Sequence, residues 1–290
     1  MTVFERTSVL IPAFDEESAI TGVIAEIRNL GNWKEIIVVD DGSADGTAAA
    51  AERAGAKVVR HPYNKGNGAA VKSAVRAAEG EFILLMDADG QHPPSEITKL
   101  TDKLENYDLI VGARSFGNQA TLSRGLGNAA LNRFASMLSG FTITDLTSGF
   151  RAAKRSRFRE FLHLLPNGFS YPATSTLAFI KAGYSVCFVP FEGQKRGGDE
   201  KSKMRPWREG SRFVMLILRM ITLFSPLRIF FPISLVFFLV GFGYMVYTIA
   251  TEIHVTNTSV LLITGAAVLF LFGLLSEQIA ALRFERTGRD

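Results

Sequence analysis

Hydrophobic and polar positions follow two different patterns along this chain. Up to about residue 191, short apolar runs rich in β-branched residues alternate with segments in which apolar residues recur every three or four positions. Beyond residue 228, apolar residues follow one another almost without interruption. The first pattern predicts strands alternating with amphipathic helices, and the second predicts long helices that are hydrophobic on every side.

Six runs have the composition of buried strands: 8–12, 35–40, 57–60, 81–87, 107–112 and 184–191. Helices are expected between the early runs, at 16–30, 47–54 and 69–78. Continuous apolar strands that alternate with helices are typical of a mostly parallel sheet covered by helices on both faces. We therefore expect an α/β fold that binds its ligands at the carboxyl ends of the strands.

Two runs near the C-terminus lack charged residues: 229–250 is 22 residues long, and 256–276 is 21 residues long. At about 1.5 Å per residue, a helix of this length crosses the ~30 Å hydrocarbon layer of a membrane. The runs therefore predict a transmembrane hairpin. A buried hairpin of a soluble protein is the alternative.

Charged residues beside the two runs predict how the hairpin is oriented. Arginines flank it on both outer sides, whereas the link between the runs carries Glu252 and His254. The positive-inside rule then assigns both termini and the large N-terminal part to the cytoplasm. We expect no signal peptide, because the first residues contain no apolar run of sufficient length. The flanking arginines are Arg205, Arg208, Arg212, Arg219 and Arg228 before the hairpin, and Arg283, Arg286 and Arg289 after it.

The segment directly before the hairpin, 205–226, has an amphipathic pattern. Arg208, Arg212 and Arg219 fall on one helical face, with apolar residues on the other sides. This pattern predicts a helix lying in the headgroup layer; a surface helix packed on the soluble part is the alternative. The expected organisation is a cytoplasmic α/β domain at 1–204, this juxtamembrane helix, and the hairpin with a short cytoplasmic tail at 227–290.

Composition and charge narrow the possible partners. The single cysteine, Cys187, excludes an internal disulfide and a cysteine-based zinc site. The net charge is +4, but the stretch 195–228 alone holds nine basic and three acidic residues. That stretch carries +6, so the rest of the chain sums to −2. Because the positive charge gathers beside the hairpin, we expect phosphate groups and anionic headgroups as partners, and no nucleic acid.

Polar motifs follow several of the predicted strands. In VVDDGSADGT (38–47), Asp40 and Asp41 end a strand, where a carboxylate can accept hydrogen bonds from a ribose or a base edge. Ser43 or Asp45 is expected to cap the helix that begins near Gly46. The glycine-rich NKGNGAAV (64–71) matches neither a phosphate loop nor a dinucleotide fingerprint. It is expected to form a turn and the start of a helix.

The motif LLMDADGQHPP (84–94) contains the strongest chemical signal. Asp87, Asp89 and Gln91 supply carboxylate and amide oxygens within five residues, and Ala88 and Gly90 allow the bend that would turn both carboxylates toward one ion. Hard-oxygen ligands of this kind suit Mg²⁺ or Mn²⁺. Solvated turn aspartates are the alternative.

Basic residues accumulate in the second half of the α/β part. Arg114, Arg124 and Arg151 precede the loop QKRGGDEKSKM (194–204). This loop suits a clamp on phosphates, and an ordinary solvated charge run is the alternative. The four histidines (His61, His92, His163 and His254) have no recognisable motif partner, so no histidine–carboxylate dyad is expected.

Five motifs occur in order ahead of the hairpin: IPAFDEE (11–17), VVDDGSADGT, DADGQHPP, DLTSGFR (145–151) and the basic loop with SKM. Together they resemble family 2 glycosyltransferases, and within them the polyprenyl-phosphate branch typified by dolichol-phosphate mannose synthase and bacterial undecaprenyl-phosphate glycosyltransferases. The resemblance covers nearly the whole chain. It implies a GT-A fold, with a Rossmann-like, mostly parallel sheet, for the glycosyltransferase domain at 1–204.

The resemblance also implies roles for residues of this chain. Donor-binding residues would be Pro12, Phe14, Glu16, Val39, Asp41, Asp87, Ala88, Asp89 and Gln91, with Val39 and Asp41 at the base and ribose. Metal ligands would be Asp87, Asp89 and Gln91. Catalytic residues would be Asp89, Arg114, Arg196 and Lys203, and the acceptor phosphate would contact Arg114, Ser123, Arg124 and Asn128. The family spacing R-x-x-G-x-S-K is one residue shorter than RGGDEKSK here, which makes Lys201 a competitor of Lys203.

By this resemblance, the chain would transfer a hexosyl group from a nucleotide-sugar of the GDP-mannose or UDP-glucose type to a membrane polyprenyl phosphate. The transfer would depend on Mg²⁺ or Mn²⁺ and invert the anomeric centre. A phosphate monoester is mostly a dianion at pH 7, so the acceptor would need no general base. A homo-oligomer formed through the hairpin is a further expectation.

Three other functions stay open at the level of the sequence. A processive polysaccharide synthase would share the GT-A core, but it would need a QxxRW motif and more membrane spans than the two runs found here. A catalytically silent membrane subunit that scaffolds a partner is the second alternative. The third is a soluble nucleotide sensor anchored peripherally at the membrane, which would explain the basic helix but not the two full spans. The intact DADGQ motif favours an active enzyme.

Overall fold

The computed structural model describes residues 1–90, 92, 94–114, 122–168, 170–192, 218, 221 and 224–285; for 94, 95, 122–126 and 283–285 it describes the backbone alone. The chain divides into two units, Met1–Lys203 and Met204–Asp290. The first unit contains the sheet and the second contains the apolar hairpin.

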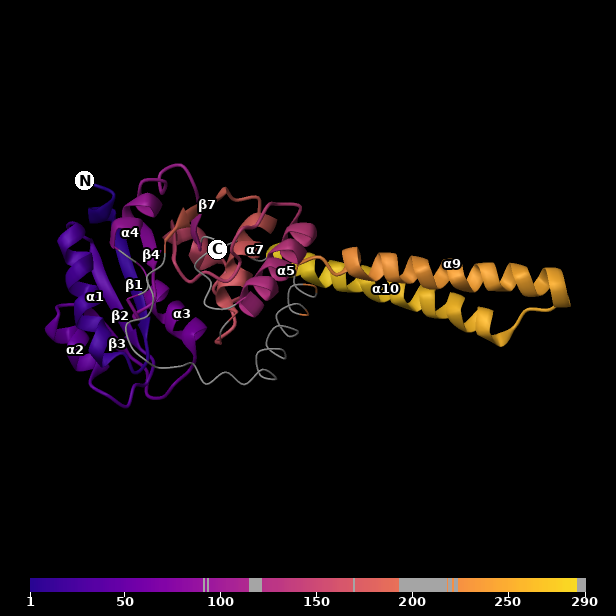
Figure 1. Ribbon diagram of the computed structural model, residues 1–290, viewed down its shortest axis with the longest axis horizontal. Coiled ribbons are helices and arrows are strands. Elements are labelled where there is room, and N and C mark those ends of the chain that lie inside the picture. The colour runs from indigo at the N-terminus through magenta and orange to yellow at the C-terminus, as the bar shows by residue number, and fades with distance from the viewer. Residues whose placement is uncertain are drawn as a thin grey trace. The chain divides into compact units, whose positions relative to one another are not determined.

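The first unit alternates strands and helices along the chain (Figure 1). Its strands are β1 (Thr7–Ala13), β2 (Glu35–Asp40), β3 (Lys57–Arg60), β4 (Phe82–Leu85), β5 (Leu109–Arg114), β6 (Arg151–Lys154) and β7 (Val186–Phe191). Its helices are α1 (Glu17–Leu30), α2 (Thr47–Arg53), α3 (Asn67–Ala77), α4 (Pro94–Thr101), α5 (Leu122–Ser139), α6 (Arg155–Glu160) and α7 (Tyr171–Lys181), after a 3₁₀ turn at Phe4–Arg6.

In the described part of the chain, the strands form one sheet in the order β3-β2-β1-β4-β6-β5-β7. All neighbours pair in parallel except β6, which is antiparallel to both β4 and β5. The expected α/β fold with a mostly parallel sheet is thus confirmed, and the six predicted strands are all present. β6 and helices α4 to α7 were not predicted, and they complete the half of the sheet beyond β4.

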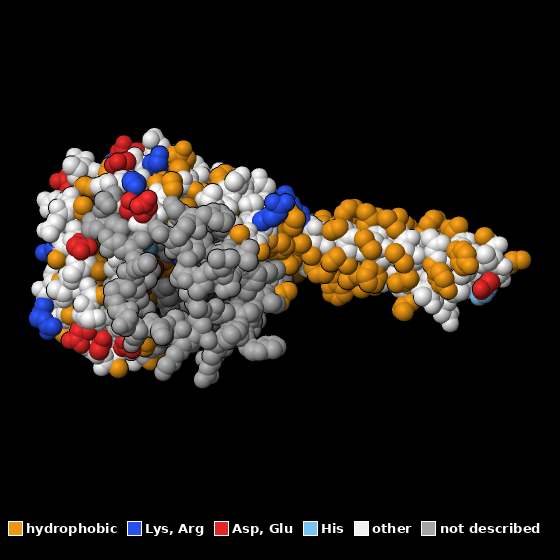
Figure 2. Space-filling model, in the orientation of Figure 1, with side chains coloured by type: hydrophobic (Ala, Val, Ile, Leu, Met, Phe, Trp, Pro, Cys, Tyr) orange, Lys and Arg blue, Asp and Glu red, His pale blue; other side chains and the backbone are white. Residues whose placement is uncertain are grey.

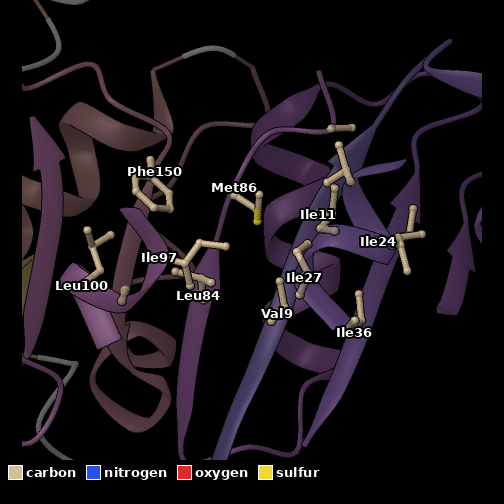
Figure 3. Close-up of a cluster of buried hydrophobic side chains, with 14 of the residues drawn as sticks. Val9, Ile11, Ile24, Ile27, Ile36, Leu84, Met86, Ile97, Leu100 and Phe150 are labelled. Atoms are coloured by element: carbon tan, nitrogen blue, oxygen red, sulfur yellow. The ribbon is translucent and has the colours of Figure 1, made fainter. Parts of the chain in front are cut away.

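Helices cover the sheet because both of its faces are apolar. Alternate strand residues such as Val9, Ile11 and Ile36 pack under α1, which contributes Ile24 and Ile27 (Figure 3). α4 covers the neighbouring region of the same core with Ile97 and Leu100. The strand residues between them point to the opposite face, where α3 packs on β1 and β2. Each fully buried aliphatic side chain contributes roughly 1.5–3 kcal/mol to stability.

The second unit is an antiparallel pair of long helices, α9 (Leu227–Glu252) and α10 (Asn257–Glu285). Both are long and apolar enough to cross a membrane. Figure 2 shows hydrophobic side chains over most of the visible face of this hairpin, with acidic and histidine side chains at its tip. Gly241 and Gly273 allow close packing, since an added Cβ would lie 2.8 Å from Leu262 and 2.6 Å from Phe230, respectively.

One carboxylate links the two helices away from the tip of the hairpin, where α9 begins. Glu277 of α10 accepts a hydrogen bond at Oε2 from the backbone amide of Leu227, the first residue of α9, at 3.1 Å. A negative charge at this place satisfies an otherwise free helix amide and interacts favourably with the helix dipole. The predicted juxtamembrane helix at 205–226 lies almost entirely outside the described residues and stays a prediction.

Candidate functional site

A cavity of about 380 Å³ lies at the carboxyl edge of the sheet in the first unit. This volume lies within the range of small-molecule sites. The cavity is lined from four places: the end of β1 and its following turn, the residue after β2, the turn and first residues of α3, and the segment after β4. The lining residues are Pro12, Ala13, Phe14, Glu16, Asp41, Asn64, Asn67, Ala70, Asp87, Ala88 and Asp89.

Most donor-binding residues named from the sequence meet in this cavity. Pro12, Phe14, Glu16, Asp41, Asp87, Ala88 and Asp89 all line it. Val39 does not, because its side chain has no exposed surface and lies inside the sheet, where it pairs with Pro12. Ala13, Asn64, Asn67 and Ala70 line the cavity although sequence reasoning gave them no site role.

Several other predicted residues lie outside the cavity lining or outside the described side chains. Arg114 ends β5 and Asn128 lies in α5, and neither is among the residues that line the cavity. The side chains of Ser123 and Arg124 are not described. Gln91, Arg196, Lys201 and Lys203 fall outside the described residues.

The cavity walls from β1 and β2 are held by hydrogen bonds between two motifs. Asp15, with a left-handed backbone (φ +54°), accepts from the Ala44 amide at 2.9 Å. The Glu17 carboxylate accepts from the Gly46 amide at 2.8 Å, and Asp45 in turn accepts from the Glu17 amide at 3.2 Å. The turns that start α1 and α2 therefore satisfy each other's free amides.

The N-cap position of α2 is Gly46, and Asp45, directly before it, accepts from the amide of Thr47 at Oδ1 at 3.0 Å. Ser43 instead donates its hydroxyl to Asp40, whose Oδ1 also accepts the Ser43 amide at 3.0 Å. Asp40 is therefore engaged within its own turn and does not line the cavity. Of the two strand-end carboxylates, only Asp41 reaches the cavity.

Asp41 is almost fully buried at the cavity wall, with 3% of its surface exposed. Its Oδ1 accepts from Nδ1 of His61 at 2.6 Å and from the Lys65 amide at 3.0 Å, and its Oδ2 accepts from the Gly66 amide at 2.8 Å. The sequence-based expectation that no histidine pairs with a carboxylate is therefore wrong. The parallel register of β2 and β3 pairs Asp40 with Arg60, so the next residues of the two strands, Asp41 and His61, lie side by side.

The turn before α3 has the conformation that its glycines permit. Gly66 has φ +99°, and a Cβ on Gly68 would lie 2.1 Å from the carbonyl oxygen of Pro166. The predicted turn and helix start at 64–71 is confirmed, since α3 begins at Asn67. Because of this close approach, the first turn of α3 packs directly against the 166–168 segment. In this position Asn64 and Asn67 line the cavity.

Asp87 and Asp89 reach the cavity from the end of β4. Gly90 has φ +72°, which provides the expected bend. Burial raises the pKa of the Asp87 carboxyl above its ordinary value, and the positive charges of Arg114 and Arg151 oppose that rise. The amide of Asp87 donates to Nδ1 of His92 at 3.3 Å.

His92 is itself buried, and burial lowers its pKa to about 4. The ring is therefore neutral at pH 7 and can accept the Asp87 amide. It stacks on Phe150, with the ring centroids 4.7 Å apart. His92 thus supports the backbone that carries the acidic motif.

The donor set at this place fits a divalent ion. In the described part of the chain, no three His, Cys, Asp or Glu side chains form a ready metal cluster. Two carboxylates, Asp87 and Asp89, nevertheless line one cavity. Mg²⁺ commonly binds through one or two carboxylates together with substrate phosphates and water, so a complete protein cage is not required.

The motif DLTSGFR packs beside the acidic motif. Arg114 forms two hydrogen bonds with Asp145, from Nε to Oδ2 at 2.8 Å and from Nη2 to Oδ1 at 3.2 Å, and Nη2 also donates to Thr147 at 2.8 Å. Gly149 lies against Asp87, since an added Cβ would be 3.0 Å from Oδ2. The loop 145–149 therefore contacts both the arginine and the carboxylate.

Arg151 holds this loop in place through hydrogen bonds. It is fully buried, and its Nη1 donates to the Pro172 carbonyl at 3.0 Å and to Ser175 Oγ at 2.6 Å, while Nη2 donates to the Ser148 carbonyl. Burial lowers the pKa of Arg151, and the carboxylates of Asp145 and Asp87 act against that effect. Arg151 is thus a structural residue that ties the loop to the first turn of α7.

Comparison with known families identifies both units. The family model described as "Glycosyl transferase family 2" matches residues 8–162, and the model described as "GtrB C-terminal hairpin" matches residues 225–282. The first match covers more than half of the chain and includes the cavity residues. The second covers α9 and most of α10.

Curated relatives agree with these matches. The glycosyltransferase AglJ of Haloferax volcanii is 30% identical over 98% of this chain and 97% of its own length. A dolichyl-phosphate hexose transferase of Haloferax volcanii is also 30% identical, over 72% of this chain and 90% of its length. The polyprenol monophosphomannose synthase of Mycolicibacterium smegmatis is 28% identical, over 66% of this chain and 78% of its length.

The fold has a counterpart among solved structures. The glucosyl-3-phosphoglycerate synthase of Mycobacterium tuberculosis, crystallised with Mn²⁺, UDP and phosphoglyceric acid, matches 74% of this chain and 77% of its own with a TM-score of 0.60 at 23% identity. This similarity concerns the fold alone, and it confirms the expected GT-A architecture of the first unit. Taken with the two family models and the full-length relative, it shows that the chain belongs to glycosyl transferase family 2.

Proposed function

We propose that this chain transfers a hexosyl group from a nucleotide-sugar to a polyprenyl phosphate held in the membrane. One observation carries the proposal: the cavity of the first unit gathers Asp41, Asp87 and Asp89 at the carboxyl edge of the sheet. The relatives support the lipid acceptor, because they include enzymes named for transfer to dolichyl, polyprenol and undecaprenyl phosphates.

The spacing of the carboxylates suits a nucleotide-sugar. β1 separates β2 from β4 in the sheet, and neighbouring strands lie about 4.8 Å apart, so the positions following β2 and β4 lie about 10 Å apart. The nucleoside would bind beside Asp41, with Asn64 and Asn67 on the same wall. The diphosphate would then lie beside Asp87 and Asp89.

The diphosphate leaving group needs positive charge. A divalent ion held by Asp87 and Asp89, with Gln91 as a third ligand, would neutralise the charge that develops on it. We assign Arg196 and Lys203 of the basic loop to the same task. Arg114, held by Asp145, would add a fixed positive charge close to Asp87.

The acceptor phosphate would act as the nucleophile without a general base, because it is already mostly a dianion at pH 7. One of its oxygens forms a bond to the anomeric carbon while the bond from that carbon to the diphosphate oxygen breaks. The nucleoside diphosphate leaves with the bonding electrons, and an in-line displacement converts an α-linked donor into a β-linked lipid product. Ser123, Arg124 and Asn128 are our candidates for binding the acceptor phosphate.

The hairpin and its flanking charges support a membrane acceptor. α9 and α10 are each long and apolar enough to span a bilayer, and arginines flank the hairpin on its outer sides. By the positive-inside rule, both termini and the first unit would lie in the cytoplasm. A homo-oligomer formed through the hairpin remains part of the proposal.

The decisive test is transfer by the full-length chain in detergent. UDP- and GDP-sugars would be incubated with undecaprenyl phosphate and Mg²⁺ or Mn²⁺, and the lipid product would be read by mass. We expect a polyprenyl-phosphate hexose from one nucleotide series. Asp89→Asn should lower the rate about 10²–10³-fold, the usual loss when a group stabilising transition-state charge is removed.

Glu26→Gln, on the exposed face of α1, is the matched control and should transfer at the rate of the unmodified chain. No product with any donor would refute the transferase proposal. Full activity of the Asp89→Asn variant would refute the role assigned to that carboxylate.

A further inference from the structure

His61 is a buried histidine that the proposed reaction does not use. Its side chain is 6% exposed, and it lies between two polar side chains. Nδ1 lies 2.6 Å from Asp41 Oδ1, and Nε2 lies 2.8 Å from the hydroxyl oxygen of Ser73 on α3. A line of three side chains therefore runs from α3, through the imidazole, to a carboxylate in the cavity wall.

The partners determine which ring nitrogen carries the proton. An ionised carboxylate can only accept, so Nδ1 must donate to Asp41. Nε2 then faces the Ser73 hydroxyl, which can both donate and accept. Asp41 thereby fixes Nδ1 as the nitrogen that carries the proton, and Ser73 holds the other edge of the ring through Nε2.

The hydrogen bonds of Asp41 to the described residues leave one of its acceptor positions unused. Oδ1 accepts from His61 and from the Lys65 amide, while Oδ2 accepts from the Gly66 amide as its only hydrogen-bond donor among the described residues. A carboxylate has about four acceptor sites, so Oδ2 retains one. Because Asp41 lines the cavity, that site is available to a ligand.

We propose that His61 is a positioning residue for the donor: with Ser73 it holds the Asp41 carboxylate so that Oδ2 accepts an N–H or hydroxyl hydrogen of the nucleoside. This inference rests on the proposed function, which places a nucleotide in the cavity. His61 acts through Asp41 and would not touch the substrate. Its effect should therefore fall on donor affinity and leave the chemical step alone.

Two isosteric substitutions separate this role from simple packing. The amide nitrogen of Asn is attached to Cγ, as Nδ1 of His is, so His61→Asn keeps a donor beside Asp41. The amide nitrogen of Gln lies one bond further out, as Nε2 does, so His61→Gln keeps a partner for Ser73 and removes the donor to Asp41. Both variants lose the ring, so the loss of packing is shared.

The measurement is isothermal titration of the full-length protein in detergent with UDP and with GDP, each in the presence of Mn²⁺. We expect His61→Asn to bind the preferred nucleotide within about threefold of the unmodified chain, because the hydrogen bond to the charged group is kept. His61→Gln should bind about 10–100-fold more weakly, because that hydrogen bond is lost. Ser73→Ala should weaken binding about 2–5-fold, since the ring stays but loses the hydrogen bond that holds its Nε2 edge.

Steady-state kinetics give a second readout that a packing defect would not produce. His61→Gln should raise the KM for the nucleotide-sugar about 10-fold or more with kcat within about twofold, as expected for a contact equally strong in ground and transition states. Thermal unfolding of both variants shows whether they are folded.

Equal affinities of His61→Asn and His61→Gln would overturn the positioning role, and so would a loss confined to kcat. If the unmodified chain binds neither UDP nor GDP, the proposed function fails and the inference fails with it. If the unmodified chain binds nucleotide and His61→Gln binds it equally well, only the inference fails.

Discussion

At the scale of single residues, the first unit pairs its buried charges across loops. Asp145 is 4% exposed and receives both Nε and Nη2 of Arg114. Burial by itself raises the pKa of the Asp145 carboxyl, but the hydrogen bonds and charge of Arg114, with the amides of Arg114 and Thr147, hold that pKa below its ordinary value. The ionised carboxylate is therefore the form that the fold stabilises.

This pair predicts how stability depends on pH. The contribution of Asp145 should be complete above its unfolded-state pKa of about 3.9 and disappear as the pH falls through the lower folded-state value. At pH 7, Asp145→Asn should lower stability by about 1.5–3 kcal/mol, the usual worth of hydrogen bonds to a charged group. Thermal unfolding in detergent, followed by circular dichroism from pH 7 to pH 3, should show the difference between the two proteins shrinking below about pH 4.

A difference between variant and unmodified chain that stays constant over this pH range would contradict the assignment. Asp102→Asn serves as the control, since Asp102 is an exposed aspartate without a side-chain partner of this kind among the described residues. It should show no such pH-dependent difference.

The sequence predicted those site residues that lie at the end of a predicted strand. Asp41 directly follows β2 and Asp87 comes two residues after the end of β4, so their place at the carboxyl edge follows from the pattern alone. Asn64 and Asn67 could not be placed, because their position depends on Gly68 packing against the 166–168 segment, about 100 residues away along the chain. The contact between His61 and Asp41 was within reach, since the register of two predicted parallel strands implies it.

At the scale of elements, the sequence predicted the strands with β-branched residues and missed those without them. β6 reads RAAK and contains no β-branched residue, yet it is buried between β4 and β5. α7 was missed because it is buried on every side: residues Tyr171 to Phe179 are all buried, so the helix shows no amphipathic period. Neighbouring elements override local propensity in both cases.

The start of α3 should be intolerant of a single methyl group. Gly68→Ala would place a Cβ 2.1 Å from the backbone oxygen of Pro166, which cannot move without shifting its loop. We expect a loss of about 1–3 kcal/mol, the usual cost of overpacking. Nucleotide binding should weaken as well, because Asn67 lines the cavity beside the altered turn.

Gly22→Ala is the matched control in α1. Nothing lies within 4 Å of the added Cβ, and the backbone is helical. Alanine is the better helix former by about 0.8–1 kcal/mol, so this variant should be slightly more stable. Thermal unfolding of the two variants checks the contrast, and equal midpoints would contradict the role given to the Gly68 contact.

At the scale of the whole molecule, charge and hydropathy are divided between the parts of the chain. The apolar residues that raise the average hydropathy lie mainly in α9 and α10, and the positive charge gathers in 195–228, directly before them. The residues that line the cavity all belong to the first unit. The cavity and the apolar hairpin therefore belong to separable stretches of sequence.

This separation predicts the outcome of removing residues 225–290. Nucleotide binding should stay within about threefold of the full-length value, because each cavity residue and its hydrogen-bond partners remain. Transfer to undecaprenyl phosphate in vesicles should fall by about 10²–10⁴, the usual loss when a tether that raises effective concentration is removed. Transfer to a short, water-soluble prenyl phosphate should be reduced much less, since that acceptor needs no membrane attachment. Radiolabelled sugar transfer measures the loss of activity on each of the two acceptors. An equal loss on both would mean that the hairpin supports the active site itself, in addition to holding it at the membrane.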